Sequence, residues 1–183
     1  MSLRIIDCCS LINLYTGWGG LGELHRLGGT WYVADAILAE AQYTREFDSS
    51  GQVETVAFSL DELVRSAILQ RVKPESDEEI DWYVRLAQEL DDGEAQALAI
   101  AKVRGFVLLT DDAKAARIAK TLELSVETTS TATVLREWLS VDASHRARIH
   151  EVVRRITVLA RFRPARGDPA FEWWSSILQG DPI

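Results

Sequence analysis

Short apolar runs alternate with helical patterns along most of this chain, and no other feature constrains its fold as strongly. LRII at 3–6, TWYVA at 30–34 and FVLLT at 106–110 each have the length and composition of a strand. CCSLINLY follows the first run and DDGEAQALAIAKVRG precedes the last, and both have helical patterns. This alternation is typical of a parallel sheet covered by helices on both faces. The sequence therefore predicts a three-layer α/β/α fold with a central, mostly parallel sheet of four to five strands.

Turn and capping signals predict further elements. VETVAF, after the turn DSSGQ, and LSVETT are expected to be strands, and DDAKAARIAKTLEL at 111–124 a helix. Asp35 is expected to cap AILAEAQ, and Ser130 to cap STATVLREWL. Ser59, with Glu62 at the capping-box spacing, is expected to cap LDELVRSAIL. A helix over 76–90 is expected to bury one face, formed by Ile80, Tyr83, Val84 and Ala87.

The chain is expected to have two parts. Residues 1–140 should form the α/β domain, and residues 141–183 a basic helical extension packed on the same domain. One helix is expected over 144–160, followed by the linker RFRPARGDP at 161–169 and a last short helix, FEWWSSIL.

Composition and length favour a soluble, globular protein. The 183 residues are 47% hydrophobic and 26% charged, enough for one domain with a proper core. No run approaches the roughly 20 apolar residues of a membrane span, and the first residues lack the pattern of a signal peptide. Cys8 and Cys9 are neighbours and cannot build a disulfide framework or a CxxC zinc site. We therefore expect a cytoplasmic protein with no membrane partner.

The net charge of −8 argues against wholesale wrapping in nucleic acid, but the charge is unevenly distributed. Residues 143–166 contain seven arginines and one glutamate, whereas residues 75–94 contain nine acidic residues and one arginine. Two interpretations of the arginines stay open. They bind a polyanionic substrate, or they solvate a helix and pair with the acids of 75–94.

Acidic side chains follow the predicted strands at the points where those strands end. Asp7 follows the first strand, and Asp111 and Asp112 follow FVLLT. Because ligands of an open parallel sheet bind beyond the carboxyl ends of its strands, we expect these acids to project from one edge. Glu94 lies in the first turn of the alanine-rich helix, and Glu40 lies within AILAEAQ.

Each acid taken singly also has a simpler interpretation. An acid at a helix start, such as Asp112 or Glu94, is commonly a cap or a partner of the helix dipole. Glu40 can face solvent, although its apolar neighbours would make burial costly without a partner. The combination of the acids is more specific than any one of them.

In this combination the chain resembles the PIN-domain family, which carries a D-x-S-x-L-I pattern at the first strand, an early helical Glu, a GEA-type helix start and a later T-x-D. The matching residues are Asp7 in DCCSLINL, Glu40 in ILAEAQ, Glu94 in DDGEAQALAIA and Asp112 in LLTDDAKAARIA. The resemblance covers residue 3 to about residue 140. Cys9 stands where the family often has a small hydroxyl residue, which leaves the source of an orienting hydrogen bond open.

The resemblance implies a metal-dependent endoribonuclease that hydrolyses RNA with Mg²⁺ or Mn²⁺. It assigns the catalytic role to Asp7, Glu40, Glu94 and Asp112. Asp7, Glu94 and Asp112 would bind the metal, and Asp111 would either bind it directly or support a ligand. Many small bacterial relatives are toxins of toxin–antitoxin pairs, which would imply a homodimer and an antitoxin that covers the acidic site.

The chemistry of the residues is compatible with this expectation. Carboxylate oxygens suit hard cations such as Mg²⁺ or Mn²⁺. The three histidines, His25, His145 and His150, have no metal-ligand spacing with the acids, which argues against zinc. A divalent cation would also supply the counter-charge that lets Asp111 and Asp112 stand side by side.

Positive charge is needed to hold RNA beside such a cluster. The predicted substrate-binding residues are Arg4, Lys114, Arg117, Arg154 and Arg155. Trp31, Trp82 and Trp138 are expected in the core, whereas Trp173 and Trp174 either dock on the domain or form a partner surface.

Two other functions compete with the nuclease. A PIN-fold module that binds RNA or protein without catalysis would lack one of the acids, and none of the four is missing. A phosphatase of the haloacid dehalogenase type needs D-x-D at the first strand, and the residue two after Asp7 is Cys9.

Overall fold

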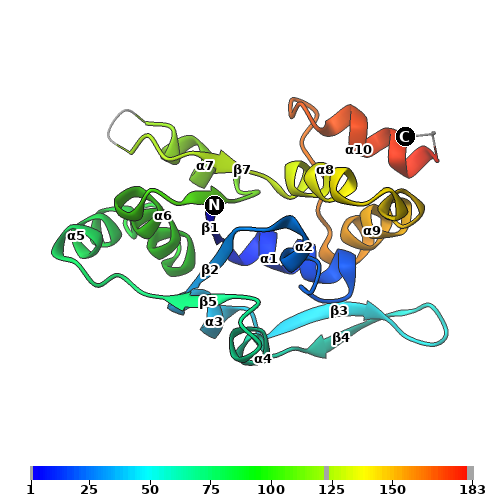
Figure 1. Ribbon diagram of the computed structural model, residues 1–183, viewed down its shortest axis with the longest axis horizontal. Coiled ribbons are helices and arrows are strands. Elements are labelled where there is room, and N and C mark those ends of the chain that lie inside the picture. The colour runs from blue at the N-terminus through cyan, green and yellow to red at the C-terminus, as the bar shows by residue number, and fades with distance from the viewer. Residues whose placement is uncertain (1, 122–123, 181–183) are drawn as a thin grey trace.

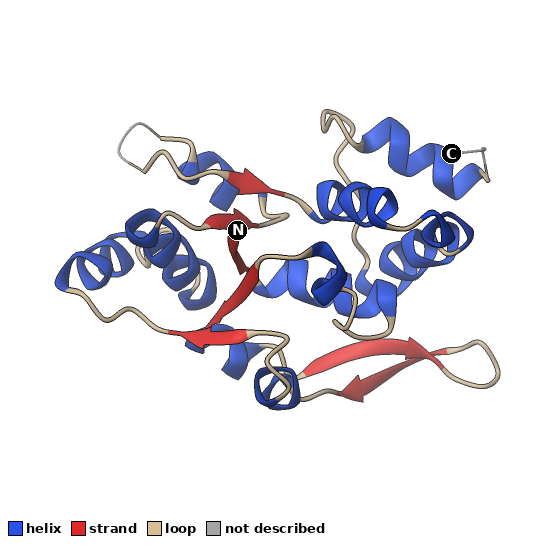
Figure 2. Ribbon diagram, viewed as in Figure 1, coloured by secondary structure: helices blue, strands red, loops and turns tan. Residues whose placement is uncertain are grey.

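A sheet of five parallel strands lies at the centre of the computed structural model, which describes residues 2–121 and 124–180 (Figures 1 and 2). The order of the strands is β5–β2–β1–β6–β7. Their bounds are β1 (Leu3–Ile6), β2 (Thr30–Ala34), β5 (Gln70–Val72), β6 (Val107–Leu109) and β7 (Thr128–Thr129). The first strand of the sequence therefore lies in the middle of the sheet, and the predicted parallel sheet is confirmed.

Helices cover both faces of this sheet, as a three-layer fold requires. Figure 1 shows α5 (Asp77–Leu86) and α6 (Asp92–Arg104) on one side of the sheet, and α1 (Cys8–Trp18) and α8 (Thr131–Val141) on the other. The remaining helices before α8 are α2 (Leu24–Leu27), α3 (Asp35–Glu40), α4 (Leu60–Arg65) and α7 (Ala113–Ala119). The helix expected over 111–124 thus ends at Ala119, and residues 122 and 123 lie outside the described residues. None of the helices in residues 2–121 and 124–180 has the length and hydropathy of a bilayer span.

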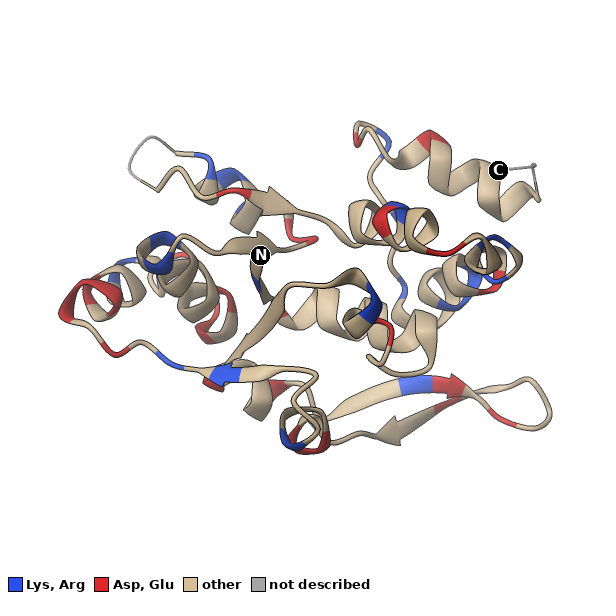
Figure 3. Cartoon of the chain, in the orientation of Figure 1, with Lys and Arg blue, Asp and Glu red and all other residues tan. Residues whose placement is uncertain are grey.

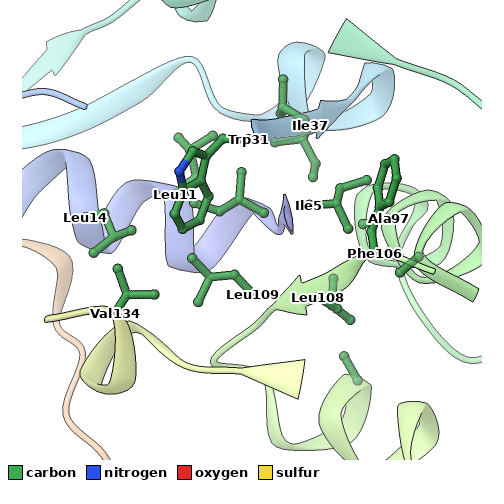
Figure 4. Close-up of a cluster of buried hydrophobic side chains, with 14 of the residues drawn as sticks. Ile5, Leu11, Leu14, Trp31, Ile37, Ala97, Phe106, Leu108, Leu109 and Val134 are labelled. Carbon is green, nitrogen blue, oxygen red and sulfur yellow. The ribbon is translucent and has the colours of Figure 1, made fainter. Parts of the chain in front are cut away.

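The core forms where the apolar strands meet the helices. Ile5 and Leu108 of the two central strands belong to one buried cluster that also contains Leu11 of α1 and Ala97 of α6 (Figure 4). The alanines of α6 let this helix approach the sheet closely, and its residues from Ala97 to Ala101 are buried throughout. Gly105 ends α6 in the left-handed conformation, at φ 68°.

An antiparallel hairpin outside the main sheet was not fully predicted. It joins β3 (Tyr43–Phe47) to β4 (Val53–Ala57), and only the second strand was expected. The first strand, YTREF, contains two charged residues, which weaken the apolar alternation that marks a strand.

One predicted helix cap is wrong, and one predicted capping box does not form. Asp35 is the first residue of α3 rather than its cap, and its carboxylate accepts two hydrogen bonds from Arg71. Ser59 is the N-cap residue of α4, as predicted, but its side chain makes no cap hydrogen bond. A capping box forms instead at Ser76 and Glu79 at the start of α5, where Glu79 also pairs with Arg104 at 2.5 Å.

The predicted buried face of 76–90 is also wrong. Ile80 and Val84 are 44% and 57% exposed, whereas Glu79, Leu86 and Leu90 are buried. The regular helix ends at Leu86 and not at residue 90, so the chain turns before Leu90. The buried face of α5 contains Glu79, which forms an ion pair with Arg104 of α6.

The C-terminal part packs on α1. It consists of a 3₁₀ turn η1 (Ala143–Ala147), α9 (Ile149–Arg155), a π-helical turn η2 (Ile156–Ala160) and α10 (Phe171–Gln179), so the single helix expected over 144–160 is broken. Contact with α1 is close at Gly17, where an added Cβ would lie 2.7 Å from Cδ1 of Ile156. Trp174 of α10 is fully buried, so this tryptophan docks on the domain.

The basic and acidic regions of the sequence do not pair with each other. Within the described residues, Arg148 pairs with Glu23 and Arg154 with Glu151, while Glu75 and Glu79 pair with Arg104 of α6. Figure 3 shows the acidic residues of α5 on the opposite side of the molecule from α9. The two regions are therefore separate surfaces.

Candidate active site

Asp7 lies at the carboxyl end of the central strand, at the start of α1. Register pairs Ile6 with Leu109, so β1 and β6 end side by side, and the amide of Asp7 donates to the carbonyl of Leu109 at 3.0 Å. The side chain caps α1 by accepting a 2.7 Å hydrogen bond from the amide of Ser10 on Oδ1. Asp7 is 1% exposed, and its Oδ2 has no hydrogen-bond partner among residues 2–121 and 124–180. Burial raises the pKa of Asp7 to about 6.

Glu94 and Asp112 stand beside Asp7. Glu94 lies in the first turn of α6 and Asp112 caps α7, where it accepts a 2.7 Å hydrogen bond from the amide of Ala115. Burial, together with the negative charges of Asp91, Asp112 and Asp7, raises the pKa of Glu94 to about 7. The structure therefore brings together three of the acids predicted from the sequence.

Asp111 points away from this group and joins three elements of the fold. Its Oδ1 accepts from the amide of Thr131 at 2.9 Å. Its Oδ2 accepts from the Asn13 side chain at 2.8 Å, from the Ser10 hydroxyl at 3.2 Å and from the Thr131 hydroxyl. Burial raises the pKa of Asp111, and these hydrogen bonds oppose that rise. Asp111 thus holds the end of β6 to α1 and α8 through the hydrogen bonds that it accepts from those helices.

Glu40 lies next to the start of α6 and not among the other three acids. Its Oε1 accepts from the amide of Gly93 at 3.2 Å, and its Oε2 lies 2.7 Å from the position of a Cβ on Gly93. Only glycine therefore fits at residue 93 with Glu40 in this place. Burial and the charges of Asp91 and Asp92 raise the pKa of Glu40.

Ser10, one residue after the position where the family often has a small hydroxyl residue, contacts two of the acids. Its hydroxyl donates to Asp111 at 3.2 Å, and its backbone amide donates to Asp7. Partial burial of the Cys9 thiol, together with the nearby acids, raises its pKa to about 12. The thiol is therefore protonated at neutral pH and adds no charge to the site.

Sequence reasoning missed four residues that shape this site. Asp91 caps α6 and is a source of negative charge for both Glu40 and Glu94; its place directly before a helix start was the available signal. Asn13, Ser10 and Thr131 hold Asp111 from distant parts of the chain, and no local pattern marks such a role.

The first three predicted substrate-binding cations have different environments. Arg4 pairs with Glu137 at 2.9 Å and lies over the ring of Trp31. Lys114, beside Asp112, donates to the carbonyl of Glu89. Arg117 is exposed on the last turn of α7.

The other two, Arg154 and Arg155, lie at the far end of α1. Arg155 donates to the carbonyl of Thr16 at 2.8 Å, which is about 13 Å along the helix from Asp7. Arg154 binds Glu151 and lies over the ring of Phe47. The structure thus does not bring these two arginines together with the acids.

The donor set of the acids fits a hard divalent cation. Asp7 has a buried oxygen without a partner, and no ion pair involves Glu94 or Asp112 within the described part of the chain. In that same part, no three acidic, histidine or cysteine side chains converge to hold an ion as they stand. Glu94 and Asp112 are only half-buried, so a solvated cation has access to both carboxylates.

The metal-free protein is expected to show two raised carboxyl titrations. Carboxyl-carbon NMR should place the pKa of Asp7 near 6 and that of Glu94 near 7, because both are desolvated and crowded by like charges. Saturating Mg²⁺ should lower both values by supplying a counter-charge. Ordinary values for both groups in the metal-free protein would contradict the crowding described for this site.

Comparison with known families agrees with the fold. The model of DUF3368, a PIN-domain family, matches residues 3–157. The chain belongs to the PIN-domain family. No curated protein matches the chain significantly.

Proposed function

We propose that this protein is a Mg²⁺- or Mn²⁺-dependent endoribonuclease whose centre is Asp7 with Glu94 and Asp112. PIN domains are nuclease-like folds, and the family match covers the part of the chain that contains all three acids. The observation that carries the proposal is the unpaired, buried Oδ2 of Asp7 beside two further acids. A buried carboxylate oxygen without a partner is costly unless a cation or a proton satisfies it.

Each residue of the site has a distinct part in this proposal. The amide of Ser10 holds Oδ1 of Asp7, which leaves Oδ2 directed at the site. Asp111 fixes the end of β6, so that Asp112 and Asp7 leave adjacent strands at one edge. Glu40 anchors the start of α6 through Gly93 and so positions Asp91 and Glu94. Mg²⁺ or Mn²⁺ bound by these carboxylates would activate a water and neutralise charge on the leaving oxygen of a phosphodiester.

A cleavage assay on structured and unstructured RNA tests the proposal. We expect cleavage by the wild-type protein with Mg²⁺ or Mn²⁺ and none in EDTA. Cleavage that continues in EDTA would contradict the metal-dependent mechanism. RNA that binds but is never cut with either metal would favour the non-catalytic PIN module instead.

A further inference from the structure

A cavity of about 540 Å³ opens next to the acids at the same edge of the sheet. Thr110 and Asp112, which follow β6, line this cavity together with Thr128 and Thr129 of β7. The loop from Phe162 to Ala170 also lines it and is termed its outer wall. This is the edge at which ligands of open parallel sheets bind, and the volume is in the range of small-ligand sites.

Three basic side chains line this cavity without carboxylate partners. Lys120, Arg136 and Arg163 form no salt bridge within residues 2–121 and 124–180, and all three are exposed. Arg136 is held over the ring of Trp173, 4.9 Å from its centroid. These cations differ from Arg154 and Arg155, whose guanidinium groups are engaged at the far end of α1.

The cavity also contains three acids. Asp111 accepts hydrogen bonds from Thr131, and Asp168 accepts a 2.7 Å hydrogen bond from the amide of Ala170. Asp112 belongs to the acidic site. Within the described residues none of the three acids forms a salt bridge with Lys120, Arg136 or Arg163, so these cations stay free to bind an anionic ligand.

The rest of the lining suits a nucleotide. Hydroxyl groups of threonine and serine follow β7, and they can bond to ribose and phosphate oxygens. Phe162, Pro164 and Pro169 supply apolar surface on the opposite wall, against which a base can pack.

The outer wall is firmly held and lies beyond the family match, which ends at residue 157. The ring of Phe162 packs edge-on against Trp174 at 5.5 Å. The indole N–H of Trp174 donates to the hydroxyl of Thr157 at 3.0 Å. The C-terminal part thus completes a cavity that the matched residues alone would leave open.

We propose that this cavity binds one nucleotide of the single-stranded RNA next to the cleaved bond. In this arrangement Arg136 and Arg163 bind its phosphates, and the wall at Phe162 to Ala170 packs against its base. The inference rests on the proposed nuclease for the identity of the ligand, but it adds a substrate site built from the C-terminal part of the chain.

Binding measured in EDTA tests this site without cleavage. The probe is a 5′-labelled 12-nucleotide single-stranded RNA, followed by fluorescence anisotropy at several salt concentrations. The variant Arg136→Ala/Arg163→Ala should weaken binding about tenfold, and the slope of log K against log salt should fall by about 1.4, or about 0.7 for each lost phosphate contact. The control Arg65→Ala/Arg146→Ala removes the same charge from exposed residues outside the cavity and should change the affinity less than about twofold.

Equal weakening by the two double variants would overturn the site. A second measurement uses the wild type alone, so it does not depend on the folding of a variant. Ribonucleoside 5′-monophosphates should shift the amide resonances of Thr128, Thr129 and Arg163, and shifts confined to other surfaces would also overturn the proposal. If the cavity binds RNA but Mg²⁺ never permits cleavage, the nuclease fails and the site stands. If the wild type cleaves RNA and the cavity variant binds as well as the control, the site fails and the nuclease stands.

Discussion

Asp7→Asn is expected to lower kcat/KM for RNA cleavage by about a thousandfold, which corresponds to roughly 4 kcal/mol of transition-state stabilisation. The substitution replaces the negative carboxylate of Asp7 by a neutral amide, which binds a divalent cation much more weakly. Asparagine caps helices as well as aspartate, so the hydrogen bond from the amide of Ser10 should survive. The measurement is cleavage of one RNA by both proteins over a range of Mg²⁺ concentrations.

The same variant should be more stable than the metal-free wild type at pH 8. Folding raises the pKa of Asp7 from 3.8 to about 6, which disfavours the charged form by up to about 3 kcal/mol. This destabilisation is absent below about pH 4 and complete above about pH 6, so the two proteins should converge at low pH. Urea denaturation of both proteins in EDTA at pH 4 and pH 8 measures this difference in stability. An inactive variant that is also less stable at pH 8 would indicate a folding defect, and cleavage equal to the wild type would contradict the role of Asp7.

Asp111→Ala is expected to reduce the free energy of unfolding by about 3 kcal/mol. It leaves the donors of Ser10, Asn13 and Thr131, all of which are buried, without an acceptor. Each buried donor that loses its acceptor costs about 1–3 kcal/mol, and partial relaxation limits the sum. The midpoint of urea denaturation should fall by about 1–2 M.

Asp112→Ala is the matched control at the adjacent residue. It removes one cap of α7, which costs about 1 kcal/mol, but it should weaken Mg²⁺ binding more than Asp111→Asn, which keeps most of the acceptors at residue 111. Two results together would contradict this division of roles. In the first, Asp112→Ala is less stable than Asp111→Ala. In the second, Asp111→Asn binds Mg²⁺ more weakly than Asp112→Ala.

The sheet was predictable because its signals are local. β1, β2 and β6 are apolar runs, and a buried parallel strand needs only such a run. The start of α5 shows where local signals fail: Ser59 and Ser76 both precede a glutamate at the capping-box spacing, and only Ser76 forms the box. Glu79 also pairs with Arg104, which is distant in sequence, and no local pattern shows that contact.

The acids of the site were predictable for the same reason, and the cations were not. Asp7 and Asp112 each end a strand, so the sheet itself places them at one edge. Arg154 and Arg155 were predicted from the number of arginines in one segment, whose side chains leave it in different directions. Arg155 of α9 reaches the end of α1, whereas Arg163, in the loop after η2, reaches the cavity beside the acids. The direction of a side chain depends on the packing of its helix, which the sequence does not specify.

The most direct test of the metal centre is a crystal structure of the protein with Mn²⁺, with the metal located by its anomalous scattering. We expect a manganese peak within about 2.5 Å of Oδ2 of Asp7, with the side chains of Glu94 and Asp112 rotated toward it. Manganese bound only elsewhere, with Oδ2 of Asp7 still without a partner, would contradict the account.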